Sequence, residues 1–284
     1  MRNIRNILLP FIILISIALP SSPAQAGTWQ KVSFKMGAPT KHWEQIASCE
    51  TGKSVTQINW SKSGEYAGGL AIHHQAQFGD TNMGMWEMYG GEQFAPSPDK
   101  ATKHEQVLIA NRIANLGYKT VITKRISENG DPILYKNIRY NKKPLGYEPW
   151  PCLLSNKVKP YYKNTYSVNL PTDKSLYCPR YEDLFRKYNL PVKVFSYIAY
   201  RESRCNPGAV NAKFKNGKIT WTLNSNGTYD NGLLQINSSW FRTLRDNTGY
   251  EPTDLYNPEA NALFASWILH NTSGRLGNWS IRTF

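Results

Sequence analysis

The stretch FSYIAYRE, residues 195–202, places apolar side chains and one glutamate at the spacing i, i+3, i+4 and i+7. On an α-helix these positions form one face, so the segment predicts a helix whose apolar stripe ends in Glu202. The stretch WEQIASCE, residues 43–50, has the same spacing and ends in Glu50. The chain therefore contains two related segments, each with a carboxylate at the C-terminal end of an apolar helix face.

Further matching features follow both segments. The stretches YAGGLAI at residues 66–72 and DNGLLQI at residues 230–236 are glycine-rich and then apolar, which is typical of a turn that leads into a strand or a helix. Alanine-rich stretches at residues 101–116 and 257–269 predict a helix later in each half. The sequence thus indicates an internal repeat of two related modules.

We expect the modules at residues 41–152 and 178–284. Residues 153–177 lack either hydrophobic period and contain two prolines, so we interpret them as a linker. In the second module, Asn216 and Gly217 precede a strand-like stretch at residues 218–223, which is the signal of a β-hairpin. The predicted fold class is α+β: two tandem, mainly helical modules with a small β-hairpin sheet that lines a cleft.

The first 26 residues have the features of a secretion signal. Arg2 and Arg5 form a basic start, residues 7–19 are a mainly apolar run, and residues 24–26 form a small-residue cleavage site. An uncleaved membrane anchor is the alternative, but the run is shorter than the roughly 20 apolar residues that a spanning helix needs. We expect a secreted, extracellular chain that is not inserted in a membrane after signal cleavage.

The charge of the chain suggests an anionic partner. There are 34 Lys and Arg residues against 20 Asp and Glu, which gives a net charge of +14. The excess is spread thinly, with no basic block and no DNA- or RNA-binding motif, so we exclude nucleic acid as a partner. An anionic polymer such as the bacterial cell wall fits a diffuse positive charge better.

Four cysteines in a secreted chain indicate disulfides, for which three pairings are possible. The order of the cysteines makes Cys49 with Cys152 and Cys178 with Cys205 the economical pairing, because each pair stays within one half. A zinc site is the competing interpretation. No cysteine pair has the CxxC spacing of a structural zinc site, so we expect neither a metal nor a cofactor.

The position of each glutamate suggests acid catalysis. A glutamate on the apolar side of a helix is costly to ionise, so its pKa should rise and it could hold a proton near neutral pH. The alternative is a structural carboxylate that is bonded to backbone amides or to Arg201 or Arg204. Asp230 follows in a glycine-flanked turn, where we expect it to stay solvated and ionised. Two carboxylates in unlike environments are what glycoside hydrolysis requires.

The second module resembles the lysozyme superfamily, both c-type lysozymes and lytic transglycosylases. The stretches that carry the resemblance are ESRCNPGAVN at residues 202–211 and GTYDNGLLQINSSW at residues 227–240. The resemblance implies that Glu202 is the general acid and Asp230 the second carboxylate. It further implies that the sugar-binding cleft is lined by Gln235, Asn237 and Trp240.

The first module resembles the resuscitation-promoting factor (transglycosylase-like) domain, which also implies a lysozyme-like fold. The matching stretches are WEQIASCETG (43–52), YAGGL (66–70), MWEMYGGEQFAP (85–96), ATKHEQVLIANRI (101–113) and PWPC (149–152). The resemblance implies a single catalytic glutamate at Glu50 and a disulfide between Cys49 and Cys152. Among the nine tryptophans, we expect Trp86 here and Trp240 in the second module to stack on sugar rings.

The first module departs from its family at three places. Ala71 stands where the family has glutamine and cannot hydrogen-bond a sugar. An insertion lengthens the segment between Ala71 and Trp86, and roughly 30 residues at 119–148 replace a short connection. These departures make a weakened enzyme or a wall-binding role the alternative for this module.

The expected function is a secreted, monomeric, cell-wall-associated enzyme that cleaves peptidoglycan glycan strands. The bond cut would be the β-1,4 bond between N-acetylmuramic acid and N-acetylglucosamine, with either a hydrolysed or a 1,6-anhydro product. The alternative from another class is a non-catalytic peptidoglycan-binding or signalling protein on the same scaffold. A cationic membrane-active protein is the third interpretation.

Overall fold

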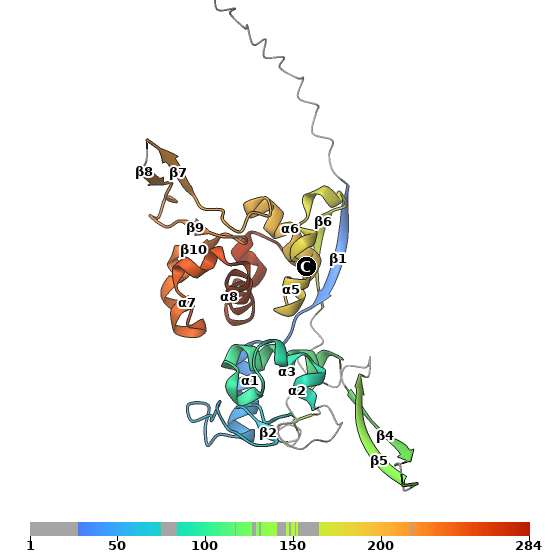
Figure 1. Ribbon diagram of the computed structural model, residues 1–284. Coiled ribbons are helices and arrows are strands. Elements are labelled where there is room, and N and C mark those ends of the chain that lie inside the picture. The colour runs from blue at the N-terminus through green and yellow to red at the C-terminus, as the bar shows by residue number, and fades with distance from the viewer. Residues whose placement is uncertain are drawn as a thin grey trace, which may run out of the picture.

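The computed structural model describes residues 28–74, 84–116, 118–126, 129–130, 132–140, 146–147, 149–150, 152, 165–216 and 218–284 (Figure 1). The predicted secretion signal and residues 153–164 of the predicted linker lie outside these ranges. None of the described helices has the length and apolar character that crossing a membrane would need.

The first module is built around two helices, and a short hairpin follows the first of them. Its elements are α1 (Thr40–Glu50), β2 (Tyr66–Ala67), β3 (Ile72–His73), α2 (Met85–Met88), the 3-10 turns η1 (Gly91–Gln93) and η2 (Pro98–Lys100), and α3 (Lys103–Leu116). The predicted face of α1 is buried, because Trp43, Ile46 and Ala47 are all fully covered. Much of the predicted insertion forms a hairpin of β4 (Tyr118–Ile126) and β5 (Pro132–Tyr140), which projects away from the module (Figure 1).

The second module packs its helices around α8. Its elements are η4 (Lys174–Leu176), η5 (Pro179–Tyr181), α5 (Glu182–Lys187), α6 (Val192–Ser203), β7 (Ala212–Lys215), β8 (Lys218–Trp221), β9 (Asp230–Asn231), β10 (Ile236–Asn237), η6 (Ser238–Trp240), α7 (Phe241–Thr248), η7 (Pro252–Tyr256), α8 (Pro258–Asn271) and η8 (Arg275–Trp279). Asn257 caps α8 by accepting a hydrogen bond from the Glu259 amide at 2.9 Å. Because α8 is covered on almost all sides, it forms the centre of this core.

The predicted hairpin of the second module is present. Strands β7 and β8 pair antiparallel, with Lys215 opposite Lys218. Asn216 has a φ of 52°, the left-handed conformation that a tight turn of this kind requires. The hairpin projects from the module beyond β9 (Figure 1).

The internal repeat includes the turn of each short hairpin, which joins β2 to β3 in the first module and β9 to β10 in the second. In the first module, the Trp150 indole donates a hydrogen bond to the Leu70 carbonyl at 2.8 Å. In the second, the Trp279 indole donates to the Leu234 carbonyl at 2.9 Å. Leu70 and Leu234 occupy the same position in YAGGLAI and DNGLLQI, so a tryptophan fixes the equivalent turn in both modules.

The same two tryptophans also pack on the helix that carries each glutamate. Trp150 contacts Trp43 edge to face, with ring centroids 4.7 Å apart. Trp279 contacts Phe195 in the same way at 5.1 Å. Trp43 and Phe195 are the first residues of the two matching helix faces, so each module links its glutamate helix to its turn through one indole.

The pairing of strands β1 and β6 contradicts our expectation of a linker. Strand β1 (Trp29–Lys35) pairs antiparallel with β6 (Thr165–Pro171), which lies inside the range 153–177 that we interpreted as irregular. Val168 and Leu170 of β6 are fully buried in the core of the second module. The alternation of these apolar residues makes a half-buried strand, so residues 165–171 belong to the second module's core.

Both disulfides lie within a module. The structure pairs Cys49 with Cys152 and Cys178 with Cys205, with Cα atoms 6.1 and 5.6 Å apart. This is the pairing that the order of the cysteines favours. Each bond lies at the end of a glutamate-bearing helix, since Cys49 is in the last turn of α1 and Cys205 follows the end of α6.

The modules contact each other through α3. Arg112 of α3 donates to the Asn189 side chain at 2.9 Å and also hydrogen-bonds the Lys187 carbonyl. Asn189 donates in return to the Leu108 carbonyl at 2.7 Å. Leu108 is itself buried within the second module's core, so the interface combines polar and apolar contacts.

Candidate active site

Glu202 lies at the C-terminal end of α6, the position that its helix face predicted. About 27% of its side chain is exposed, and its carboxylate accepts two bonds from Arg201, at 2.5 and 3.1 Å. Both bonds end on Oε1, so Oε2 is not engaged by Arg201. Arg201 also donates to the backbone carbonyl of Trp279. The ion pair is the alternative that the sequence left open for this glutamate, and it fixes the carboxylate beside Trp279.

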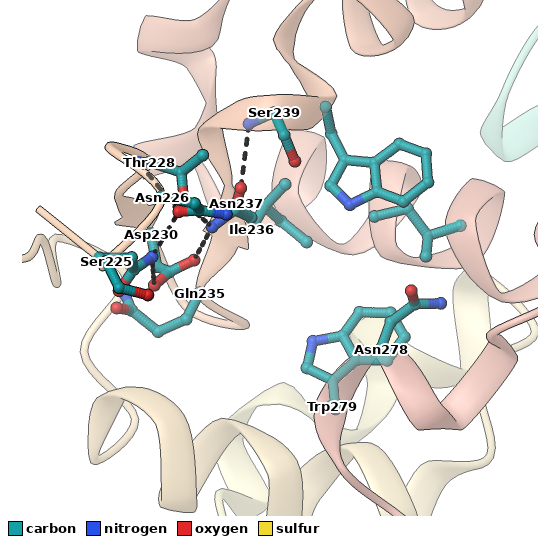
Figure 2. Close-up of a pocket in the computed structure, with 13 residues that line it drawn as sticks. Ser225, Asn226, Thr228, Asp230, Gln235, Ile236, Asn237, Ser239, Asn278 and Trp279 are labelled. Carbon is teal, nitrogen blue, oxygen red and sulfur yellow. Dashed lines mark hydrogen bonds between the residues drawn. The ribbon is translucent and has the colours of Figure 1, made fainter.

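A polar cavity of about 450 Å³ lies beside the β9–β10 hairpin (Figure 2). Its lining combines amide, hydroxyl and indole groups, from Asn224, Ser225, Asn226, Thr228, Asp230, Gln235, Ile236, Asn237, Ser239, Trp240, Ile268, Asn278 and Trp279. Four of the predicted residues, Asp230, Gln235, Asn237 and Trp240, are therefore brought together. Glu202 is not part of this lining and connects to it through Arg201 and Trp279.

Asp230 is held by amide groups, where we expected a solvated carboxylate in a turn. It belongs to β9 and lies opposite Asn237 of β10. The Asn237 amide donates to Oδ1 at 2.7 Å, and the Asn224 amide donates to Oδ2 at 3.1 Å. Both carboxylate oxygens are thus engaged, which fixes the orientation of the group on one wall of the cavity.

Gln235 lies at the turn between β9 and β10. Its φ of 49° is left-handed, and its side-chain amide donates to the backbone carbonyls of Gly232 at 2.8 Å and Ala209 at 3.2 Å. These bonds hold the side chain against the cavity wall. The carbonyl oxygen of the same amide takes no part in them, so it is the acceptor available to a ligand.

The opposite wall carries residues that the sequence analysis missed. Figure 2 shows Trp279 and Asn278 across the cavity from Asp230 and Asn237. Trp279 lies outside the quoted motifs, but its partner in the repeat, Trp150, is inside PWPC. Extending the internal repeat to the C-terminus would have found Trp279.

Glu50 is the last residue of α1, and Glu202 is the last but one of α6. Burial raises the pKa of Glu50, while a hydrogen bond from the Cys152 backbone and the charge of Lys62 act in the opposite direction. Its Oε1 atom is buried with no hydrogen-bond partner among the described residues. A raised pKa is what the helix-face argument predicted for this glutamate.

Trp86 does not occupy a ligand-facing position. Its side chain is fully buried in the core of the first module, and its indole donates to the Ala95 carbonyl at 2.9 Å. Gly91 packs so closely on the ring that an added Cβ would lie 2.2 Å from it. An indole with no exposed face cannot stack on a sugar, so we leave Trp86 out of the proposed site.

Ala71 has the same backbone conformation as Gln235 but lacks the side-chain amide. Its φ is 46°, close to that of Gln235, so the turn is the same in both modules. The alanine supplies no side-chain amide at the position that Gln235 occupies in the second module.

Within the described ranges, no group of three or more His, Cys, Asp or Glu side chains is arranged to hold a metal ion.

Each module matches a known family model. Residues 37–119 match the model of the transglycosylase-like domain, and residues 182–283 match that of the transglycosylase SLT domain. Resuscitation-promoting factor Rpf1 of Corynebacterium glutamicum is 34% identical over 77 residues, which are 26% of this chain and 33% of that protein. The match thus spans a third of that relative's length. These findings confirm the lysozyme-like superfamily and the α+β class with two tandem domains.

Proposed function

We propose that this chain, in which a transglycosylase-like domain is joined to a transglycosylase SLT domain, is a secreted, cell-wall-associated lytic transglycosylase of peptidoglycan. It would cut the β-1,4 bond between N-acetylmuramic acid and N-acetylglucosamine and act as a monomer. The observation that carries the proposal is Glu202 at the end of the apolar α6, linked through Arg201 to a polar, indole-lined cavity.

Glu202 is the general acid in this proposal. Arg201 holds Oε1, so we assign the proton transfer to Oε2, which would protonate the glycosidic oxygen of the leaving sugar. Trp240 offers an indole surface for a sugar ring, and Gln235 and Asn278 offer amides for hydroxyl and acetamido groups. The cavity therefore has the mixture of apolar faces and polar groups that carbohydrate binding requires.

Asp230 would act through its charge and not as a nucleophile. Each of its oxygens accepts an amide hydrogen bond, which holds the group in place and draws electron density from both oxygens, so each is a weaker nucleophile. A fixed carboxylate can still stabilise the positive charge that develops on the sugar ring. This arrangement favours attack by the muramic 6-hydroxyl, whose proton returns to the ionised Glu202, and the product is a 1,6-anhydro sugar.

Glu50 would be a second general acid in the first module. Its raised pKa keeps a larger share of the carboxyl protonated near neutral pH, which acid catalysis needs. Ala71 removes one sugar contact from this module, so we expect cleavage there to be slower than at Glu202.

The test is the digestion of purified sacculi by residues 27–284, with the soluble muropeptides identified by mass spectrometry. We expect 1,6-anhydro products, a loss of most activity in Glu202→Gln and a smaller loss in Glu50→Gln. Glu92→Gln is the matched control, because Glu92 is exposed and lies outside both proposed sites. Undiminished activity of Glu202→Gln would refute the assignment of the general acid.

The second candidate function is non-catalytic binding to peptidoglycan, which Ala71 favours for the first module. It predicts that the chain sediments with sacculi and releases no soluble fragments. Products with ordinary reducing ends would instead indicate hydrolysis and would contradict the role given to Asp230.

A further inference from the structure

A second cavity, of about 320 Å³, lies between the two modules. The first module contributes α1 and α3 to its wall, with Thr40, Lys41, Lys103 and His104. The second contributes α7 and α8, with Trp267 and Asn271 among the lining residues. No residue is shared with the cavity beside β9 and β10, so this is a separate site.

Two buried polar atoms in this wall have no hydrogen-bond partner among the described residues. They are Oγ1 of Thr40 and Nδ1 of His104, whose residues are 7% and 4% exposed. The other ring nitrogen of His104 does have a partner, the Ser266 hydroxyl at 3.3 Å. Buried polar groups in proteins are nearly always hydrogen-bonded, so these two atoms show that the wall is polar beneath its surface.

The charged groups of the cavity wall favour a negatively charged ligand. Lys41 has no ion-pair partner within the described ranges, whereas Lys103 pairs with Glu44, the one carboxylate in the lining. The N-terminus of α1 also faces this region without a side-chain cap, since Pro39 precedes Thr40. An uncapped helix N-terminus and an unpaired ammonium both favour an anion.

Trp267 gives the cavity a surface suited to a sugar ring. Its indole is only partly buried, and its inner side stacks on Phe264 with the ring planes 10° apart. It also contacts Trp240 edge to face at 6.4 Å, and Trp240 lines the cavity of the proposed active site. The two cavities are therefore separated by a pair of indoles.

We propose that the interdomain cavity binds one carboxylate-bearing N-acetylated sugar residue of peptidoglycan. The carboxylate would lie between Lys41 and the N-terminus of α1, and the sugar face would pack on Trp267. This inference rests on the proposed function, because peptidoglycan is the source of such a sugar.

The test is a calorimetric titration of residues 27–284 with N-acetylmuramic acid and, in parallel, with N-acetylglucosamine, which lacks the carboxylate. We expect N-acetylmuramic acid to bind at least about tenfold more tightly. Lys41→Glu should abolish this preference. The matched control is Lys53→Glu, which changes an exposed lysine of the same module outside the cavity and should keep the preference.

Three outcomes would overturn the inference. They are equal binding of the two sugars, equal loss in the two lysine variants, and binding that is lost in Asn237→Ala and kept in Lys41→Glu. The last result would place the sugar in the cavity of Asp230. Neither sugar contains a bond to be cleaved, so a failed titration leaves the sacculus digestion as an independent test of the proposed function.

Discussion

Acidification from about pH 7.5 to about pH 5.5 should destabilise the chain through two histidines at the module interface. Burial, with the nearby His270, lowers the pKa of His104 to about 3. Burial, with the charge of Arg275, lowers the pKa of His270 to about 4. Both are neutral in the folded chain throughout this range, whereas the unfolded histidines titrate near the ordinary value of 6.5.

The sign and size of the effect follow from proton uptake. The unfolded chain binds more protons below pH 6.5, so the stability from these groups is complete above that pH and falls towards the folded pKa values. Each histidine costs about 1.4 kcal/mol per pH unit below 6.5. The pair should therefore remove about 3 kcal/mol of the free energy of unfolding between the two conditions.

The assay is urea denaturation at both pH values, followed by tryptophan fluorescence, on the wild type and on His104→Gln/His270→Gln. Acid-induced changes at the carboxylates are common to both proteins and cancel in the difference. We expect the wild type to lose about 3 kcal/mol more than the variant. Equal losses in the two proteins would refute the reasoning. If the double variant folds poorly, each single variant can be compared with the wild type instead, and we expect about half of this difference in each case.

Three further predictions concern the second module. Gly232→Ala should lower the unfolding midpoint far more than Gly227→Ala, because both have a left-handed φ but only at Gly232 does an added Cβ meet a backbone carbonyl, at 2.1 Å. Removing the disulfide as Cys178→Ala/Cys205→Ala should lower the free energy of unfolding by about 3.5 kcal/mol, measured by denaturation; no change would contradict it. Asn237→Ala should slow the release of soluble muropeptides from sacculi about tenfold or more, because the cleft carboxylate loses a charge-assisted hydrogen bond; an unchanged rate would remove it from the site.

Features set by neighbouring residues were predictable from the sequence. The faces of α1 and α6 follow from the helical period, and the β7–β8 hairpin follows from Asn216 and Gly217. The residues of the β9–β10 hairpin, among them Asp230 and Asn237, share a short stretch of chain. Their proximity in the cavity therefore needed no long-range information.

Features set by distant partners were not predictable. Strand β6 could be recognised only with β1, which lies more than a hundred residues earlier in the chain. Trp86 lies in a motif that suggested sugar binding, but the ring is buried because Gly91 packs closely on it. Trp279 contributes to the cavity wall because Leu234 and Phe195 position its ring.

The pairing of β1 with β6 makes the second module discontinuous along the chain. Its first strand, β1, is synthesised ahead of the whole first module, whereas the partner strand β6 is synthesised only after that module (Figure 1). A gene fragment that starts at the second module's first cysteine would encode the helices without either strand. The two modules therefore cannot be exchanged between genes as simple consecutive blocks, and evolution would have to move them together or replace the lost strand pair.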